Sequence, residues 1–213
     1  MHNLRDIQDF INHARLAYQL VAVLPDHDGC ALALHYARFI TGFYEDHSQD
    51  NLDQQGARNI TWWHEHTGDT IVYWGGIAHT ASGNQLKAGH SAGSYLRDYL
   101  GLAYTSIGLT FHHGLGTDHV PTPSPEFAES ILGQANPDFF FLDLHAEQSG
   151  PVLAWLHSPI KTRVIGPSYN PEKDSTFFMK GSLADLFDII IHTQEITPAI
   201  PLMSPNHFQH DSD

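Results

Sequence analysis

Apolar side chains recur every three or four residues through the first third of the chain. From residue 7 to residue 24 this spacing would bury one face of an amphipathic helix, and Pro25 ends the pattern. The same spacing returns from Gly29 to Tyr44 and from Asn51 to Trp63. Residues 1–67 are therefore predicted to form a helical layer.

After Gly68 the pattern changes to short runs of β-branched and aromatic residues, which are typical of buried strands. Several of these runs are continuously apolar, which favours strands that are covered on both faces. The predicted strands are Thr70–Trp74, Ser106–Phe111, Phe139–Leu142, Thr162–Ile165 and Phe187–Ile191.

Helical patterns alternate with these runs. We predict a helix over Ala92–Leu100, a second over Pro125–Leu132 with Ser124 as its N-cap, and a capped turn over Ser182–Phe187. Alternating strands and helices predict an α/β fold with a largely parallel sheet and flanking helices, preceded by the helical layer. One domain is expected over residues 1–200, with the α/β part at 68–200 and an acidic tail at 201–213.

The charge balance limits the classes of molecule that this domain is expected to bind. Its 213 residues include 10 Lys and Arg against 24 Asp and Glu, a net charge of −14, which disfavours binding to nucleic acid or to anionic membranes. Cys30 is the single cysteine, so no internal disulfide forms. With no secretion-signal pattern at the N-terminus and no apolar run of about 20 residues, we expect a cytoplasmic protein.

Histidine is unusually frequent, at 17 residues, and several histidines follow predicted strands. Ligands of α/β sheets bind at the carboxyl ends of the strands, so these residues are predicted to share one rim. Neutral imidazoles there could act as general bases or polarise a carbonyl, with an aspartate to orient them and no cofactor. Alternatively, His79, His112 and His145 could hold a divalent metal. The predicted catalytic group is His79, His112, His113, Asp143 and His145, with His192 as a further candidate.

The stretch Gly89-His90-Ser91-Ala92-Gly93 matches the G-x-S-x-G nucleophile elbow, and Ser91, Asp143 and His192 follow the chain order of a hydrolase triad. An elbow requires a strand immediately before the serine, whereas residues 81–88 are polar and loop-like. We therefore interpret this stretch as the glycine-rich start of a helix.

The order of these segments resembles the erythromycin esterase family, whose members hydrolyse macrolide lactones. The resemblance covers roughly Asn51 to Ala199. It is carried by the helix Asp53–Asn59 running into Trp62, the stretch Ile71–His79, the helix Ala92–Gly101, the strand Ile107–Phe111, the segments Phe141–Leu144 and Arg163–Pro167, and Phe187–Asp188 leading to Thr197–Ala199.

The chain also departs from the family pattern. The strand-end motif of the family is similar to His-Asn-x-His, and here Gly76 and Ile77 replace its first two residues, which leaves His79. Leu52 stands in place of an arginine before the helix aspartate, and His145 in place of the arginine after the Asp-Leu pair. The resemblance further implies that the family's general-base histidine lies in an N-terminal half that this chain is expected to lack.

The leading hypothesis is a hydrolase of an ester or macrolide lactone, with a role in antibiotic resistance implied by the resemblance. Trp74, Gly75, Gly76 and Arg97 are its candidate substrate-binding residues, although a surface ion pair is the simpler interpretation of Arg97. A second hypothesis is a non-catalytic relative that self-associates or binds a partner chain supplying the missing half. A third is a metal-dependent hydrolase that uses the same histidines.

Overall fold

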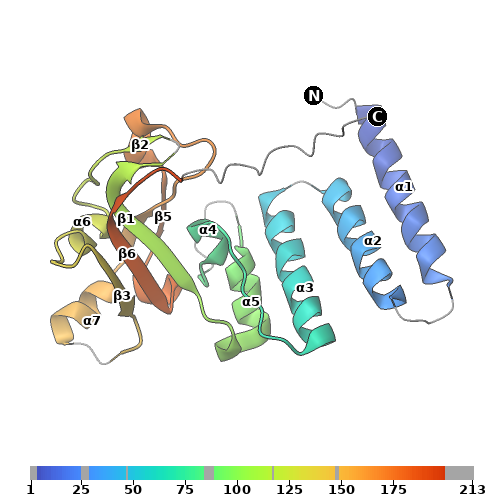
Figure 1. Cartoon of the computed structure of the whole chain (residues 1–213), viewed down its shortest axis with the longest axis horizontal. Helices are drawn as coiled ribbons and strands as arrows, with labels where there is room; N and C mark the ends of the chain where they lie inside the picture. Colours follow the sequence, from blue (N-terminus) through green and yellow to red (C-terminus); the bar gives the residue numbers. More distant parts are fainter. Residues whose placement is uncertain are drawn as a thin grey trace, which may run out of the picture.

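A computed structural model describes residues 4–24, 29–46, 48–83, 89–116, 118–146 and 149–199. A row of helices leads into a β-containing part (Figure 1). The expected tail at 201–213 and the helix-ending Pro25 lie outside the described residues.

The predicted helical layer is confirmed. It consists of α1 (Leu4–Ala22), α2 (Cys30–Glu45) and α3 (Gln49–Thr67), which lie side by side in Figure 1. The Ser48 side chain caps α3 by accepting a hydrogen bond from the Asn51 N–H. This helix runs past the predicted end at Trp63 because its stop is Gly68, whose φ of 73° is left-handed.

The predicted strand at Thr70–Trp74 is wrong. Residues 69–76 form an irregular connection from α3 to the short helix α4 (Ile77–Thr80), and none of the described strands pairs with them. Val72 and Trp74 are 84% and 83% exposed, so the run is not buried. A β-branched and aromatic run favours extended backbone, but a strand also requires a hydrogen-bonding partner. The next helix, α5 (Ala92–Leu100), has the predicted bounds and ends in a 3₁₀ turn at Gly101–Ala103.

The expectation of a largely parallel sheet is also wrong, because the sheet is small and mixed. Its order is β2-β1-β6-β3, formed by His119–Val120, Ile107–Leu115, Ile189–Ile196 and Phe139–Asp143. Only β1 and β6 are parallel among these strands, whereas β2 and β3 each pair antiparallel with their neighbours. A separate antiparallel pair contains β4 (Ile160–Arg163) and β5 (Phe178–Gly181).

Short helices connect the later strands. The capped turn predicted at Ser182 is confirmed as α8 (Leu183–Leu186), with the Ser182 side chain accepting from the Asp185 N–H. The helix predicted from Pro125 begins later, at Ala128, because residues 125 and 126 form a turn and Phe127 stands at the N-cap. The remaining elements are α6 (Ala128–Leu132), α7 (Gly150–Leu156) and a 3₁₀ segment, Pro171–Thr176.

The two faces of the mixed sheet differ. Ile190 and Phe140 turn toward the main core, which also contains Leu156, Leu183 and Phe187. The opposite face carries alternate residues of the same strands that remain partly open, with Phe139 66% and Phe141 71% exposed. The continuous apolar run of β3 therefore does not reflect burial on both faces. We call this open surface, formed by Ile107, Leu109, Phe139, Phe141 and Ile191, the open sheet face.

Candidate active site around His79

His79 forms a close pair with a buried carboxylate. Its Nδ1 lies 2.7 Å from Oδ1 of Asp53, which is buried on α3, while the imidazole itself is 40% exposed. The hydrogen bond to Asp53 raises the pKa of His79, against the opposing effect of burial. An imidazole held by a carboxylate through one nitrogen and accessible to solvent is suited to general-base chemistry.

The backbone that follows His79 is held by three hydroxyl groups. Tyr104 and Ser106 donate hydrogen bonds to the Thr80 carbonyl at 2.6 and 2.5 Å, and Ser91 donates to the Ala81 carbonyl at 2.5 Å. These donors come from α5 and from the segment before β1, so α4 is tied to both. A site fixed in this way keeps its reacting group in one orientation.

Close packing of α5 against the same carbonyls adds to this restraint. A Cβ atom at Gly93 would lie 2.3 Å from the Thr80 oxygen and 2.5 Å from the Ala81 oxygen. The glycine therefore permits a backbone approach that a larger residue would prevent. The same region explains the nucleophile-elbow sequence, because Ser91 is the fully buried N-cap of α5 and accepts from the Ser94 N–H. The interpretation of this stretch as a helix start is thus confirmed.

A largely apolar groove of about 550 Å³ is lined by residues that precede and follow His79 in the chain, although neither His79 nor Asp53 is among its described lining residues. Its walls include Trp74 and Gly75 of the predicted substrate-binding set, and Ile77 and Thr80 of α4. Its floor reaches Ile107 and Leu109 of β1 and therefore continues onto the open sheet face. Gly76 is the N-cap of α4 and is not part of the lining.

Tyr73 lines the groove and was not predicted as a site residue. Desolvation raises the pKa of its phenol, and the negative charge of Asp53 adds to this effect. The hydroxyl therefore remains protonated and available as a donor. Asp53 was missed as well, since it lies 26 residues before His79 within an ordinary helical pattern. Its place beside a histidine emerges only when α3 and α4 pack.

The other predicted histidines lie elsewhere. His112 and His113 are in the second half of β1, with their Nδ1 atoms 3.0 Å apart, and burial lowers the pKa of His112. His145 follows β3, where its Nε2 lies 2.8 Å from Oδ1 of Asp188 and its N–H donates to Asp143.

The expectation that all these residues share one rim is wrong. Because β3 is antiparallel to β6, Asp143 lies opposite Ile189, at the start of β6, whereas His113 lies opposite Glu195 near its end. The two groups are therefore at opposite ends of the sheet. His79 belongs to neither strand and lies on α4. The structure thus separates His79, His112 and His145, the alternative metal ligands, and no three metal-binding side chains cluster within the described residues.

His192 is fully buried in the middle of β6, not at the end of a strand. Its Nδ1 lies 2.9 Å from Oγ1 of Thr110, and burial lowers the pKa of the imidazole to about 4. Arg97 is engaged in a 2.5 Å ion pair with Asp188, whose other oxygen faces His145. The simpler interpretation of Arg97, as an ion-pair residue, therefore fits its position.

Comparisons with known proteins agree with this architecture. The sequence matches the erythromycin esterase family model over residues 8–196, and the chain belongs to this family. The match begins well before Asn51, where the sequence resemblance starts, so it includes the helical layer. A search of curated proteins finds no match.

Three solved structures share the fold. A Bacillus cereus protein is 24% identical with a TM-score of 0.70, and a succinoglycan biosynthesis protein is 21% identical with a TM-score of 0.73. A mutant of the erythromycin esterase EreC in its open conformation is 9% identical with a TM-score of 0.61. Each match covers 90–91% of this chain but only 51–53% of the other, so the chain spans about half the length of these proteins.

One further observation concerns membranes. None of the helices in the described part of the chain has the length and apolarity that crossing a membrane requires.

Proposed function

We propose that this chain hydrolyses an ester or lactone that carries a large apolar portion, with His79 as general base. The observation that carries the proposal is the 2.7 Å pair between His79 and Asp53, together with an apolar groove that is lined by Ile77 and Thr80 of the same short helix as His79. Membership of the erythromycin esterase family supports a macrolide lactone as the first substrate to test.

In this mechanism, unprotonated His79 removes a proton from a water molecule as the water attacks the substrate carbonyl. Asp53 positions the imidazole and stabilises its cationic form. The hydroxyl of Tyr73 donates a hydrogen bond to the carbonyl oxygen as negative charge develops there. The imidazolium then returns its proton to the departing alkoxide, giving one acid and one alcohol. The residues supply this acid–base chemistry without a cofactor.

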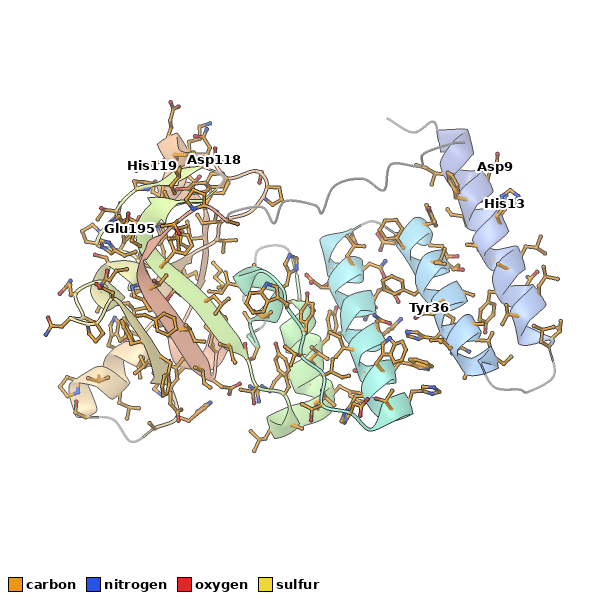
Figure 2. The ribbon with its side chains drawn as sticks, viewed as in Figure 1. Asp9, His13, Tyr36, Asp118, His119 and Glu195 are labelled. Atoms are coloured by element: carbon orange, nitrogen blue, oxygen red, sulfur yellow. The ribbon has the colours of Figure 1, made fainter. Side chains whose placement is uncertain are left out.

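The first test is mass spectrometry of erythromycin incubated with the purified chain, with and without a chelator. A product heavier by one water is expected, because hydrolysis opens the lactone. His79→Ala should lower the rate about 10²–10⁴-fold, the usual contribution of a general base. The matched control is His13→Ala, which changes an exposed histidine on α1, far from α4 (Figure 2). Equal rates in the two variants would exclude His79 as the base, and loss of activity with chelator would favour the metal hypothesis.

The pH dependence tests the role of Asp53. Because His79 acts in its unprotonated form, activity should rise with pH through its elevated pKa. Asp53→Asn removes the charge that favours the protonated imidazole, so the rising limb should move to lower pH while the maximal rate falls. If the rising part of the pH–rate curve stayed at the same pH, Asp53 would not be the group that sets the pKa of His79.

A second candidate is a protein that acts only with a second copy of itself. The open sheet face presents Leu109, Phe139 and Phe141 to solvent, and groups of exposed apolar residues commonly mark interaction sites. Two copies would equal the length of one longer relative, since each covers about half of it. Light scattering should then give a dimer, and Phe139→Lys with Phe141→Lys should convert it to a monomer. A monomeric unaltered chain would refute this candidate.

A further inference from the structure

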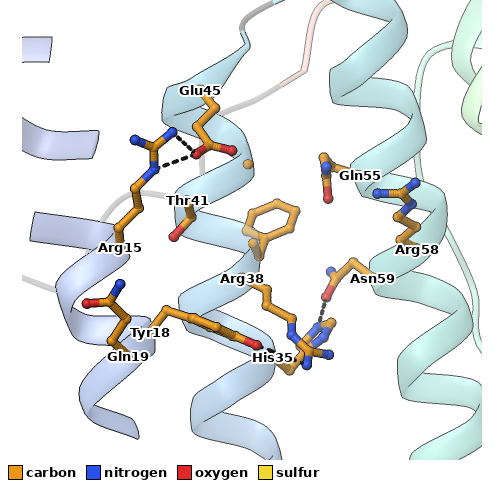
Figure 3. Close-up of a pocket in the computed structure, with 12 residues that line it drawn as sticks. Arg15, Tyr18, Gln19, His35, Arg38, Thr41, Glu45, Gln55, Arg58 and Asn59 are labelled. Carbon is orange, nitrogen blue, oxygen red and sulfur yellow. Dashed lines mark hydrogen bonds and ion pairs between the residues drawn. The ribbon is translucent and has the colours of Figure 1, made fainter. Parts of the chain in front are cut away.

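A second cavity, of about 620 Å³, lies between the three helices of the N-terminal layer, away from His79. Helix α2 forms its floor, and α1 and α3 form its walls (Figure 3). Thr41 and Gly42 are part of this floor, and Gly42 packs closely on α3, since a Cβ atom there would lie 2.9 Å from Nε2 of Gln55. The volume falls within the range of about 300–1,000 Å³ that is usual for small-ligand sites.

The charge of this cavity is opposite to that of the chain. Arg15, Arg38 and Arg58 all line it, and they are three of only 10 cationic side chains in a protein with a net charge of −14. Glu45 is the one carboxylate among the described lining residues, and Arg15 already engages it at 2.6 Å. The lining therefore retains two uncompensated positive charges.

Among the described residues, neither of the other two guanidinium groups has a carboxylate partner. Arg38 donates to the Tyr18 hydroxyl at 3.2 Å and lies over the same ring. For Arg58, no hydrogen bond or ion pair to any other described residue is found. Guanidinium groups bind phosphate and carboxylate oxygens through paired hydrogen bonds, so two of them around one cavity match a dianion.

The rest of the lining indicates an organic ligand rather than a bare ion. Gln19 and Gln55 add amide groups that can pair with hydroxyls, and the rings of Tyr18 and Phe39 add apolar surface. The cavity wall is also held in place, because His35 stacks on Trp62 at 3.9 Å between ring centroids and its Nε2 lies 2.5 Å from Oδ1 of Asn59. We propose that this cavity binds a phosphate monoester of a small polyhydroxylated molecule, with Arg38 and Arg58 on the phosphate.

Calorimetric titration with ribose 5-phosphate, inorganic phosphate and ribose tests the proposal. The phosphate monoester should bind with one site per chain, inorganic phosphate at least tenfold more weakly, and ribose not measurably. Replacing Arg38 and Arg58 together by glutamine should weaken ribose 5-phosphate binding by about 100-fold, because each charge-assisted contact contributes roughly tenfold or more. Tryptophan fluorescence supplies a second readout, since Trp62, one of four tryptophans, stacks on the lining residue His35.

The matched control removes the same charge elsewhere. Lys173→Gln with Lys180→Gln changes two exposed lysines outside the cavity and should leave the affinity unchanged. If both double variants lost affinity for ribose 5-phosphate equally, the effect would come from net charge alone, and the proposed site would be wrong. Equal affinity for inorganic phosphate and ribose 5-phosphate would show that the cavity does not recognise the organic part of the ligand. If the unaltered chain bound neither compound, the whole proposal would be wrong. Because binding is measured without hydrolysis, these outcomes are independent of His79.

Discussion

His79 and His192 show how differently one side chain behaves in two regions of this molecule. On α4, His79 is partly open to solvent and pairs with a carboxylate that raises its pKa. In the sheet, His192 is fully buried, pairs with the Thr110 hydroxyl and has a pKa lowered to about 4. The first arrangement allows proton transfer to a ligand, whereas the second stabilises a neutral ring in the core.

Glu129 belongs with His192 in this comparison. It is 1% exposed on α6, where one carboxyl oxygen accepts from the Arg163 N–H and the other has no hydrogen-bond partner among the described residues. Burial raises its pKa to about 7. Both buried groups are therefore most stable when neutral. A shifted pKa therefore occurs in buried structural groups as readily as in catalytic groups. Solvent accessibility of the side chain distinguishes the two kinds of group.

The largest expected effect on stability comes from replacing the buried histidine. His192→Ala should lower the free energy of unfolding by about 2–5 kcal/mol, because it leaves a cavity in the core and removes the partner of Thr110. His79→Ala should cost less, about 1–2 kcal/mol, since the imidazole lies partly in solvent but is a partner of the buried Asp53 carboxylate. Urea unfolding at pH 7 measures both. A larger loss for His79→Ala would reverse the assignment of structural and chemical roles.

A smaller effect, with a distinctive pH dependence, is expected at Glu129. Its raised pKa means that the native state binds more protons between pH 4.5 and about 7, so the stability that its neutral form contributes is lost as pH rises through that window. Glu129→Gln stays neutral and should be more stable than the unaltered chain at pH 8 by up to about 3 kcal/mol, with little difference at pH 4.5.

His192 contributes a pH dependence of stability that is opposite in sign to that of Glu129. The two contributions can therefore be separated in the same unfolding measurement. With its pKa lowered from 6.5 to about 4, the unfolded state binds more protons in that interval, so stability rises with pH from 4 to 6.5. In the unaltered chain the two slopes partly cancel, whereas in Glu129→Gln the opposing slope is removed and the rise to which His192 contributes should be steeper. Parallel stability curves for the two proteins from pH 4 to 8 would contradict the burial of an ionisable Glu129.

The sequence predicts the longer helices α1, α2, α3 and α5 because their information is local, whereas the short helices α4 and α7 were not predicted. The bounds of α5 and the cap at Ser182 follow from spacing and cap residues. Strand direction is not local, since the run Phe139–Leu142 is equally apolar in a parallel or an antiparallel strand. That ambiguity placed His145 and His113 at the same end of the sheet, whereas the structure places them at opposite ends.

The candidate site was predictable only in part for the same reason. His79 is identified from the sequence by its position after a glycine pair and by the family motif. Its partner Asp53 lies on a different helix, and the run at residues 70–74, predicted as a strand, instead lines the groove. Pairs formed by packing of distant segments leave no spacing signal in a single sequence.

The parallel pairing of β1 with β6 also sets the order in which the chain can fold. Ser106, which holds the Thr80 carbonyl, donates its own N–H to Asp188, 82 residues later, and Arg97 reaches the same carboxylate across 91 residues. Such distant contacts form slowly, because a long loop must close first. During synthesis, the backbone beside His79 can therefore reach its final arrangement only after residue 188 has left the ribosome. We expect the helical layer to form early and the surroundings of His79 to form last.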